Sequence, residues 1–308
     1  MINSITTDVP SSLDIEWVIN NYCNFNCSYC TPDLFGNTSR ALDLPIAVEF
    51  FNTVHQQHPG IKMLSLSGGE PTLWKHLPEF VDSVASNYFF HIITNGSRTL
   101  DWWRRFMYNR KIDRITISLH VEQINFDKTF ANIEFLQNQT DLTLLVLLKP
   151  GSKEILEQFV KRITDAKISA SIKIKPLTSH DSRSVYNYNE EEKLWLQHFS
   201  YNKANINSYS GIAKRLIVDG KEHSMSYAYK LVAGGLNNFR GWNCNLGSSR
   251  MFIWHDGNVF PATCKTAMSK PIGNVFSNTL EVKTSSTKCA DEFCHCAPDI
   301  RITKSRNV

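Results

Sequence analysis

The chain lacks a long hydrophobic run, a charged leader and a block of charge of either sign. Its longest apolar stretch, residues 142–148, contains Thr143 and is far shorter than the roughly 20 residues of a membrane helix. The first residues have no charged end followed by an apolar core, so no secretory signal is expected. The net charge of +4 is spread over 308 residues, which gives no reason to expect a nucleic-acid partner. We therefore predict a cytoplasmic protein that does not contact a membrane.

Cysteine is absent from a long central segment, between Cys30 and Cys244. Because cytosolic proteins rarely keep disulfides, cysteines that cluster on either side of such a gap more often bind metal. The two groups are Cys23, Cys27 and Cys30, and Cys244, Cys264, Cys289, Cys294 and Cys296.

The segment without cysteine alternates β-rich runs with helical stretches, which is typical of βα units around a parallel sheet. The expected strands are residues 15–20, 62–67, 89–94, 114–120, 142–148 and 169–175. The expected helices are residues 45–58, 77–87, 100–109, 123–137 and 154–166.

Beyond residue 176 the alternation ends, and a polar helix-like segment covers residues 189–201. We place a domain boundary after it, which divides the chain into residues 1–204 and 205–308.

The expected strands have one apolar and one polar face. In residues 114–120, for example, Ile115 and Ile117 alternate with Thr116 and Ser118. If helices cover the apolar face, the polar face lines an interior, which favours a partial barrel over a doubly wound sheet. For the last strand, with Lys173 and Lys175, the alternative is a solvent-facing edge strand protected by lysines.

The first cysteine group follows the first expected strand directly, where βα barrels place active-site loops. Three thiolates on one short loop can hold three irons of a [4Fe-4S] cluster and leave the fourth iron open. A zinc knuckle or buried free thiols are the alternatives. The spacing C-x3-C-x2-C, with Tyr29 before the last cysteine, resembles the signature of the radical S-adenosylmethionine (SAM) superfamily.

This resemblance covers roughly residues 13 to 178 and implies a partial (β/α)6 TIM-like barrel. It also implies two cofactors, SAM and a [4Fe-4S] cluster, and a flavodoxin- or ferredoxin-type electron donor. The implied mechanism is reductive cleavage of SAM to a 5'-deoxyadenosyl radical, which removes a hydrogen from the substrate.

Glycines and polar residues at the ends of successive strands fit the same resemblance. Ser67-Gly68-Gly69-Glu70 looks like the GGE motif that holds the methionine part of SAM, and a lone Gly-Gly would indicate only a turn. For Thr94 and Asn95 the alternative is a plain turn, for His120 a histidine buried in the core, and for Lys149 an ordinary solvated lysine. The implied cofactor-binding residues are Gly68, Gly69, Glu70, Thr94, Asn95, Ser118, His120 and Lys149.

The second cysteine group surrounds a predicted hairpin. Asp256-Gly257 supplies a turn halfway between Cys244 and Cys264, so the two cysteines should meet at the open end of the hairpin. The segment resembles the SPASM/twitch extension of radical SAM enzymes, which implies a small α+β domain with one auxiliary [4Fe-4S] cluster. It departs from the usual pattern in two ways. Two extra residues separate the turn from Cys264, and the last two cysteines have the spacing C-x-C where C-x2-C is common. A structural zinc site is the alternative.

Five thiols are available for a cluster that takes four, and the spacing does not identify the spare one. Cys289 is the least secure ligand because it stands apart from Cys294 and Cys296. A spare thiol could donate hydrogen to a substrate radical, so Cys289 is a candidate catalytic residue.

We expect a radical SAM oxidoreductase or epimerase with a small-molecule or short peptide substrate. The first strand begins near residue 15, which leaves no room for a leader-binding domain ahead of it. Modification of a ribosomal peptide is the alternative reaction, and a two-cluster electron carrier is the non-enzymatic alternative. The GGE motif and the polar strand face favour the enzyme, because a carrier needs neither.

Overall fold

The computed structural model describes most of the chain. The described residues are 2–8, 12–38, 42–177, 185–198, 200–202, 208–209, 212–213, 215–225, 227–281, 286–294 and 296–306. The predicted boundary at residue 204 lies outside them. Among the described residues, no helix has the length and apolar character needed to cross a membrane.

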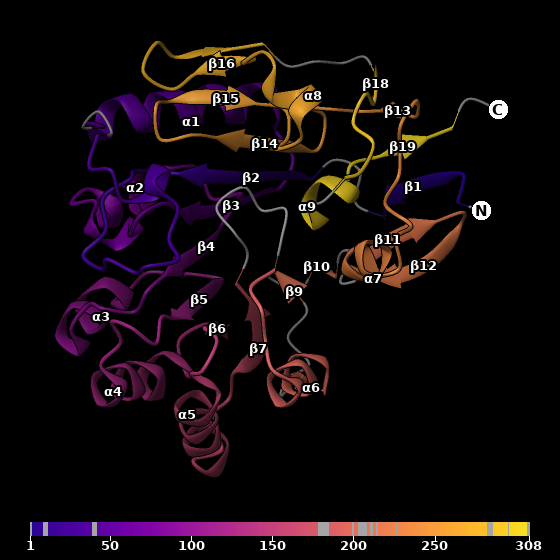
Figure 1. Cartoon of the computed structure of the whole chain (residues 1–308). Coiled ribbons are helices and arrows are strands. Elements are labelled where there is room, and N and C mark those ends of the chain that lie inside the picture. The colour runs from indigo at the N-terminus through magenta and orange to yellow at the C-terminus, as the bar shows by residue number, and fades with distance from the viewer. Residues whose placement is uncertain are drawn as a thin grey trace.

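Six parallel strands, each following its predecessor in the sheet, form the barrel wall (Figure 1). The strands are β2 (Leu13–Val18), β3 (Lys62–Ser67), β4 (Tyr88–Thr94), β5 (Arg114–Leu119), β6 (Asp141–Leu148) and β7 (Ser171–Pro176). The helices that connect them are α1 (Leu44–Gln57), α2 (Leu77–Ser83), α3 (Leu100–Met107), α4 (Phe126–Leu136) and α5 (Lys153–Asp165). The predicted βα alternation is therefore confirmed, and the chain has an α/β fold with a partial TIM-like barrel.

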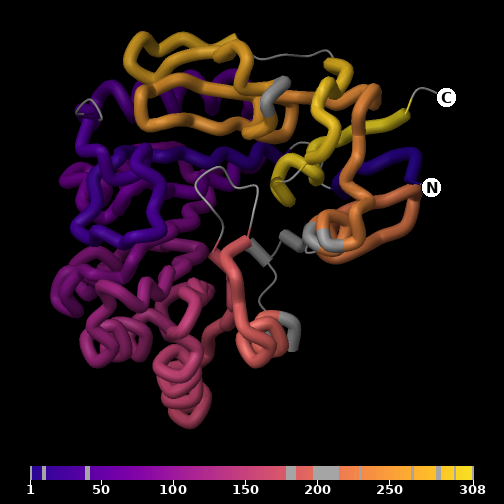
Figure 2. Tube along the Cα trace, in the orientation of Figure 1, coloured from indigo at the N-terminus to yellow at the C-terminus, as the bar shows by residue number. Residues whose placement is uncertain are grey.

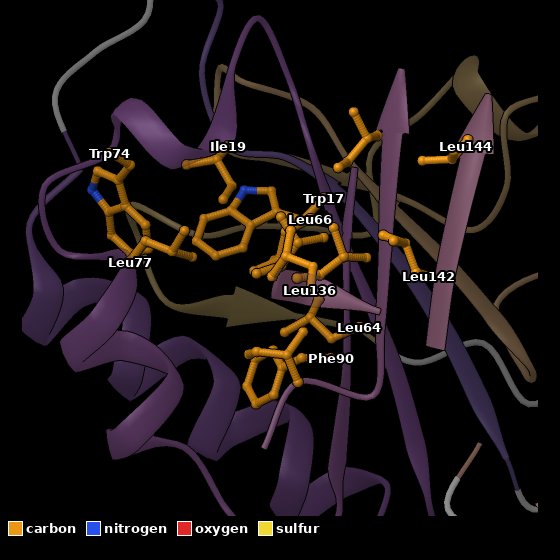
Figure 3. Close-up of a cluster of buried hydrophobic side chains, with 14 of the residues drawn as sticks. Trp17, Ile19, Leu64, Leu66, Trp74, Leu77, Phe90, Leu136, Leu142 and Leu144 are labelled. Carbon is orange, nitrogen blue, oxygen red and sulfur yellow. The ribbon is translucent and has the colours of Figure 1, made fainter. Parts of the chain in front are cut away.

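The apolar faces of these strands pack against the helices, as predicted. Trp17 of β2 is almost fully buried, with its ring centroid 5.1 Å from that of Phe51 in α1 and 5.4 Å from that of Phe80 in α2. Figure 3 shows Trp17 and Leu66 within this cluster. Because truncation of such a side chain costs about 3–5 kcal/mol, this interface fixes the positions of the strands that carry the site.

The opposite faces of the strands form a polar barrel interior. His91 of β4 lies between Ser65 of β3 and Thr116 of β5, with its Nδ1 3.2 Å from Ser65 Oγ and its Nε2 2.9 Å from Thr116 Oγ1. The predicted polar interior is thus confirmed, and its buried imidazole has partners for both nitrogens.

The barrel sheet continues beyond both of its outer strands. On one side, β14 (Arg250–Ile253) pairs in parallel with β2 and forms a hairpin with β15 (Asn258–Phe260); on the other side, β8 (Ser200–Asn202) pairs antiparallel with β7. Beyond β15, the antiparallel strands β16 (Gly273–Asn274) and β17 (Thr279–Leu280) follow. Because β7 has a partner on each side, the alternative that its lysines protect an edge strand is wrong.

The predicted Asp256-Gly257 turn joins β14 to β15. Gly257 has φ +83°, and a Cβ there would lie 2.5 Å from the Phe276 ring. A side chain is therefore excluded twice, by backbone conformation and by space.

A second, six-stranded sheet includes strands from both ends of the chain, and Figure 2 shows the N- and C-terminal segments side by side. Its central strand β1 (Ser4–Thr7), which the sequence analysis missed, pairs with β11 (Arg215–Val218) and β19 (Lys304–Ser305). The other strands are β12 (Lys221–Ser224), β13 (Asn243–Cys244) and β18 (Thr287–Lys288). Since residues 250–280 extend the barrel sheet and residues 4–7 belong to the second sheet, the two predicted units share both sheets.

The remaining elements are short. They are α6 (Glu190–His198), α7 (Tyr227–Ala233), α8 (Lys265–Met268), α9 (Ala297–Ile300), β9 (Ser208–Tyr209), β10 (Ile212–Ala213) and the 3-10 turns η1 (Pro32–Leu34) and η2 (Pro71–Leu73).

Three predicted helices were each four residues too long, and the one expected over residues 100–109 ends two residues early at Met107. The segment expected over residues 189–201 ends at His198 because residues 200–202 pair with β7. Helix α4 begins three residues late because the Asn125 side chain accepts a hydrogen bond from Lys128 N and caps it there. Helix α2 ends at Ser83, and the next residue, Val84, has an extended backbone conformation.

Candidate functional site

The two glycines after β3 let this loop lie against the chain that leads into the first cysteine group. Gly69 N donates to Asn20 O over 2.9 Å, and Glu70 N donates to Tyr22 O over 2.6 Å. A Cβ on Gly69 would lie 2.2 Å from Tyr22 O, and one on Gly68 would lie 2.6 Å from Asn20 O. The sequence analysis explained these glycines by approach to a ligand; in the structure they also permit contact between two backbones.

Glu70 is fully buried and joins the loop after β3 to the loop after β4. Its Oε1 accepts hydrogen bonds from Thr72 N, Thr72 Oγ1 and Thr94 Oγ1 over 3.0, 2.5 and 2.7 Å. Its Oε2 accepts from Asn95 N over 2.7 Å. Burial raises the pKa of Glu70, and the hydrogen bonds oppose that rise. The carboxylate thus stabilises the loop after β4, which contains the predicted cofactor-binding residues Thr94 and Asn95.

Cys23, Cys27 and Cys30 lie close together on the loop after β2. Burial, and then the neighbouring thiols of Cys30 and Cys23, raise the pKa of Cys27 to about 11. Phe25 N donates to Cys23 Sγ over 3.3 Å, and Asn95 Nδ2 lies 3.7 Å from the same sulfur. Donors of this kind stabilise a thiolate, so the donor set suits three irons of a [4Fe-4S] cluster.

Within the residues that the structure describes, no group of three or more His, Cys, Asp or Glu side chains is arranged to hold one metal ion. A four-iron cluster does not require such an arrangement, because each thiolate binds a different iron.

His120, which follows β5, lies beside the cysteine loop. Its Nδ1 is 3.2 Å from Tyr29 Oη and 3.5 Å from Cys27 Sγ, and its ring stacks on Tyr29 with centroids 5.9 Å apart. Burial lowers the pKa of His120 to about 4, so the ring is neutral at pH 7. Ser118, predicted together with His120 to contact SAM, is buried on the same face of β5.

Lys149, at the end of β6, is bound to a residue that the sequence analysis did not single out. Its Nζ lies 2.5 Å from Glu122 Oε1. Glu122 Oε2 also accepts from Ser28 N over 2.7 Å, and Oε1 accepts from Ser28 Oγ over 2.6 Å. Since Ser28 follows Cys27 directly, the Glu122 carboxylate links the cysteine loop to the chain that follows β5 and β6. No local sequence pattern marks Glu122, because its partners lie 94 and 27 residues away.

Four thiols of the second cysteine group line one small cavity. They belong to Cys244, Cys264, Cys289 and Cys294, and Lys304 lies among them. Burial first, and then neighbours that include Cys289, raise the pKa of Cys264 to about 12 and that of Cys244 to about 11. The cavity volume is about 20 Å³, room for one water, so a cluster would require these thiols to move apart. Their number and chemistry suit a four-thiolate cluster.

Cys296 does not line this cavity. Its thiol lies near Thr263, Asp299 and Arg250. The prediction selected Cys289 as the candidate spare thiol, whereas the geometry groups Cys289 with the other three and separates Cys296.

Comparison with protein families gives a match within the barrel. Residues 17–166 match the family model described as the radical SAM superfamily. Over 117 residues the chain is 31% identical to a protein of Metallosphaera sedula named "Probable GTP 3',8-cyclase", which covers 35% of this chain and 34% of the relative. It is 26% identical over 185 residues to a GTP 3',8-cyclase of Campylobacter jejuni, 59% of this chain and 50% of the relative. The matches thus span about a third to a half of these relatives' length.

Two solved structures share the fold at low identity. One is anSMEcpe with bound AdoMet, with a TM-score of 0.53 and 17% identity over 86% of this chain and 78% of the other. The second is SuiB of Streptococcus suis bound to the precursor peptide SuiA, with a TM-score of 0.55 and 14% identity over 86% and 62%. Residues 17–166 thus match a radical SAM domain by sequence, and the cofactors of such domains are SAM and a [4Fe-4S] cluster.

Proposed function

We propose that the protein is a radical SAM enzyme whose substrate binds in the polar interior of the barrel. The observation that carries this proposal is the joining of the three-cysteine loop to three neighbouring barrel loops. Gly69 and Glu70 hold it from β3, Asn95 from β4 and Glu122 from β5. An electron carrier would need the thiols but not this connected set of barrel loops.

When bound, SAM and the cluster supply a 5'-deoxyadenosyl radical from reductive cleavage. The chain's own residues position and enclose that chemistry. Cys23, Cys27 and Cys30 would hold three irons, and Gly68 and Gly69 let the loop after β3 lie against the backbone at Asn20 and Tyr22, which leads into these cysteines. Tyr29 and His120 cover Cys27, which is only 5% exposed, and limit the access of water to its sulfur.

The four thiols of Cys244, Cys264, Cys289 and Cys294 are proposed to hold one auxiliary [4Fe-4S] cluster, as in a twitch-type domain. Cys296 is then the spare thiol. This assignment replaces Cys289 as the candidate hydrogen donor, because Cys289 lines the cavity and Cys296 does not.

Three reaction outcomes follow from this arrangement. Loss of an electron from a substrate radical gives an oxidised product, return of a hydrogen gives an epimer, and internal bond formation gives a cyclised product. The relatives named GTP 3',8-cyclase support cyclisation, and the structure with a bound precursor peptide supports a peptide substrate. Oxidation or epimerisation of a small molecule remains our prediction from the five thiols.

Iron content tests the two cluster assignments. Anaerobically reconstituted wild type is expected to hold about eight irons, four per cluster. Simultaneous Cys23→Ala, Cys27→Ala and Cys30→Ala should leave about four. Unchanged iron content in this variant would contradict the assignment of the first cluster.

Single substitutions of the C-terminal cysteines test the second assignment. Cys244→Ala, Cys264→Ala, Cys289→Ala and Cys294→Ala should each lose auxiliary-cluster iron, whereas Cys296→Ala should keep it. Loss in the Cys296 variant together with retention in the Cys289 variant would reverse our choice of the spare thiol. With substrate in deuterated water, uptake of one deuteron indicates epimerisation, and an oxidised product without deuterium indicates dehydrogenation.

A further inference from the structure

Lys304 of β19 is a buried lysine in the wall of the four-thiol cavity. Only 4% of its surface is exposed. In the second sheet it lies opposite Cys244 on one side and Ile5 on the other, because β19 pairs with both β13 and β1 (Figure 1). Residues directly opposite each other on neighbouring strands point to the same face, so the side chains of Lys304 and Cys244 line the cavity together.

The ammonium of Lys304 is held by two further residues of the cavity wall. Its Nζ donates to Asp299 O over 2.8 Å and lies 4.8 Å from the centroid of the Phe239 ring. An ammonium has three donors, and within the described part of the chain Lys304 has this carbonyl as its one acceptor and pairs with no carboxylate. Lys304 therefore brings a positive charge and further donors to the thiols.

Two residues with carboxylates, Asp299 and Asp291, line the same cavity. Asp299 Oδ1 accepts from Arg250 Nε over 2.8 Å, and its Oδ2 accepts from Thr263 N and Oγ1 over 3.0 and 2.7 Å. Asp291 is partly exposed, so solvent weakens its field. A buried cation without a counter-ion is costly, and four thiolates with their irons would supply the missing negative charge.

We propose that Lys304 raises the reduction potential of the auxiliary cluster assigned to Cys244, Cys264, Cys289 and Cys294. The inference rests on the proposed function, which gives the cluster to these thiols. Net charge and hydrogen bonds to sulfur set the potential of an iron-sulfur cluster. A cation stabilises the reduced, more negative state more than the oxidised one, and burial strengthens this difference because little water screens it.

The step that Lys304 favours is the transfer of an electron to the oxidised cluster. In the oxidation named above, the substrate radical loses an electron to the cluster and a proton to water. No bond to iron forms or breaks, and the product is oxidised while the cluster is reduced. A higher potential makes this transfer more favourable, so Lys304 supports oxidation over the return of a hydrogen.

Redox titration with dithionite, followed by electron paramagnetic resonance, tests the role of Lys304. Every protein carries Cys23→Ala, Cys27→Ala and Cys30→Ala, so that the signal comes from the auxiliary cluster alone. Lys304→Met should lower the equilibrium constant for one-electron reduction at least tenfold, which moves the midpoint potential down by about 59 mV. Lys304→Arg, which keeps the charge, should stay within about threefold of the reference protein.

Lys288→Met is the matched control. Lys288 directly precedes the proposed ligand Cys289, but its side chain is exposed, so water screens its charge. This variant should stay within about threefold of the reference. Lys304→Gln, which keeps a donor for Asp299 O, is titrated if Lys304→Met holds no cluster. Loss of the cluster from both neutral variants, with retention in Lys304→Arg, would support the need for a positive charge.

Equal potentials in Lys304→Met and the reference, or an equal shift in Lys288→Met, would overturn the inference. Loss of the cluster from all three Lys304 variants would also overturn it, because packing would then explain the effect. An unshifted potential in a variant that holds its four irons rejects this inference alone. A reference protein without iron rejects the auxiliary cluster as well, whereas failure of wild type to cleave SAM rejects the radical SAM function.

Discussion

At the scale of single residues, the site depends on the absence of a side chain at Gly69 as well as on the side chains that are present. Gly69 has no Cβ where one would lie 2.2 Å from Tyr22 O and 2.7 Å from Leu34 O. Both contacts are backbone atoms, which cannot move aside independently of the loop that carries Cys23.

Gly69→Ala should displace the cysteine loop, reduce iron in the first cluster and weaken SAM binding, at a cost of about 1–3 kcal/mol from overpacking. Iron analysis and equilibrium dialysis with SAM measure these effects. Gly220→Ala is the control for loss of a glycine without crowding: its φ of +77° strains an alanine, but no atom lies within 4 Å of the added Cβ. If both variants keep full iron and SAM affinity, the close contact of the two loops has no functional importance.

Glu122 is the second residue that holds the cysteine loop in position. Burial alone would raise its pKa, but hydrogen bonds from Lys149 and Ser28 lower it to about 2 from an ordinary value of 4.5. A carboxylate with a lowered pKa stabilises the fold fully above its ordinary pKa, and this contribution is lost as the pH falls toward the lowered value.

Glu122→Gln should therefore reduce stability at pH 7, and the difference from wild type should shrink as the pH falls from about 4.5 toward about 2. Iron should also leave the first cluster of the variant about tenfold faster under a chelator, since bonds to a charged group are lost. Denaturation at several pH values and chelator kinetics measure the two effects. Glu157→Gln, which alters a surface pair on α5, should change neither; an equal effect in both variants would refute the role of Glu122.

At the scale of elements, local patterns predicted more than long-range contacts did. Alternation of Ile115 and Thr116 is a property of neighbouring residues and correctly predicted β5. Strand β1 could not be predicted, because Ile5 pairs with Val218 and Lys304, far along the chain. The hairpin turn was visible as Asp-Gly, whereas the parallel pairing of β14 with β2 depends on tertiary packing.

In the candidate site, too, some features follow from local sequence and others depend on tertiary contacts. The cysteine loop and the GGE motif were visible as spacing. The contacts of Glu122 with Ser28 and the separation of Cys296 from the cavity depend on which elements meet, and no local spacing encodes them.

Arg250 joins the barrel to the C-terminal elements. It is 4% exposed, and it bonds Glu16 of β2 over 2.7 Å and Asp299 of α9 over 2.8 Å. Removal of one member of a buried ionic group leaves uncompensated charge and costs about 3–5 kcal/mol.

Arg250→Met should lower the free energy of unfolding by about that amount, toward its lower end because Glu16 is partly exposed. Arg215→Met is the control, since Arg215 and Glu222 are each more than half exposed and their pair should contribute less than about 1 kcal/mol. Chemical denaturation of both variants measures the difference. Similar small losses in the two variants would show that Arg250 does not couple the two sheets.

At the scale of the whole molecule, both groups of thiols belong to one framework of connected sheets. The first group lies at the barrel mouth, and the second lies in a cavity formed entirely by residues 239–304. The second sheet binds the two chain ends together through β1 and β19, and β14 continues the barrel sheet. The C-terminal segment is thus built into the barrel sheet.

The most direct test of the account is reductive cleavage of SAM. Anaerobically reconstituted wild type, reduced and supplied with SAM but no substrate, is predicted to form 5'-deoxyadenosine and methionine slowly. The variant with Cys23, Cys27 and Cys30 replaced by alanine is predicted to form neither, although it keeps its second set of irons. Formation of 5'-deoxyadenosine by that variant at the wild-type rate, or its absence from fully reconstituted wild type, would contradict the assignment of the barrel mouth as the active site.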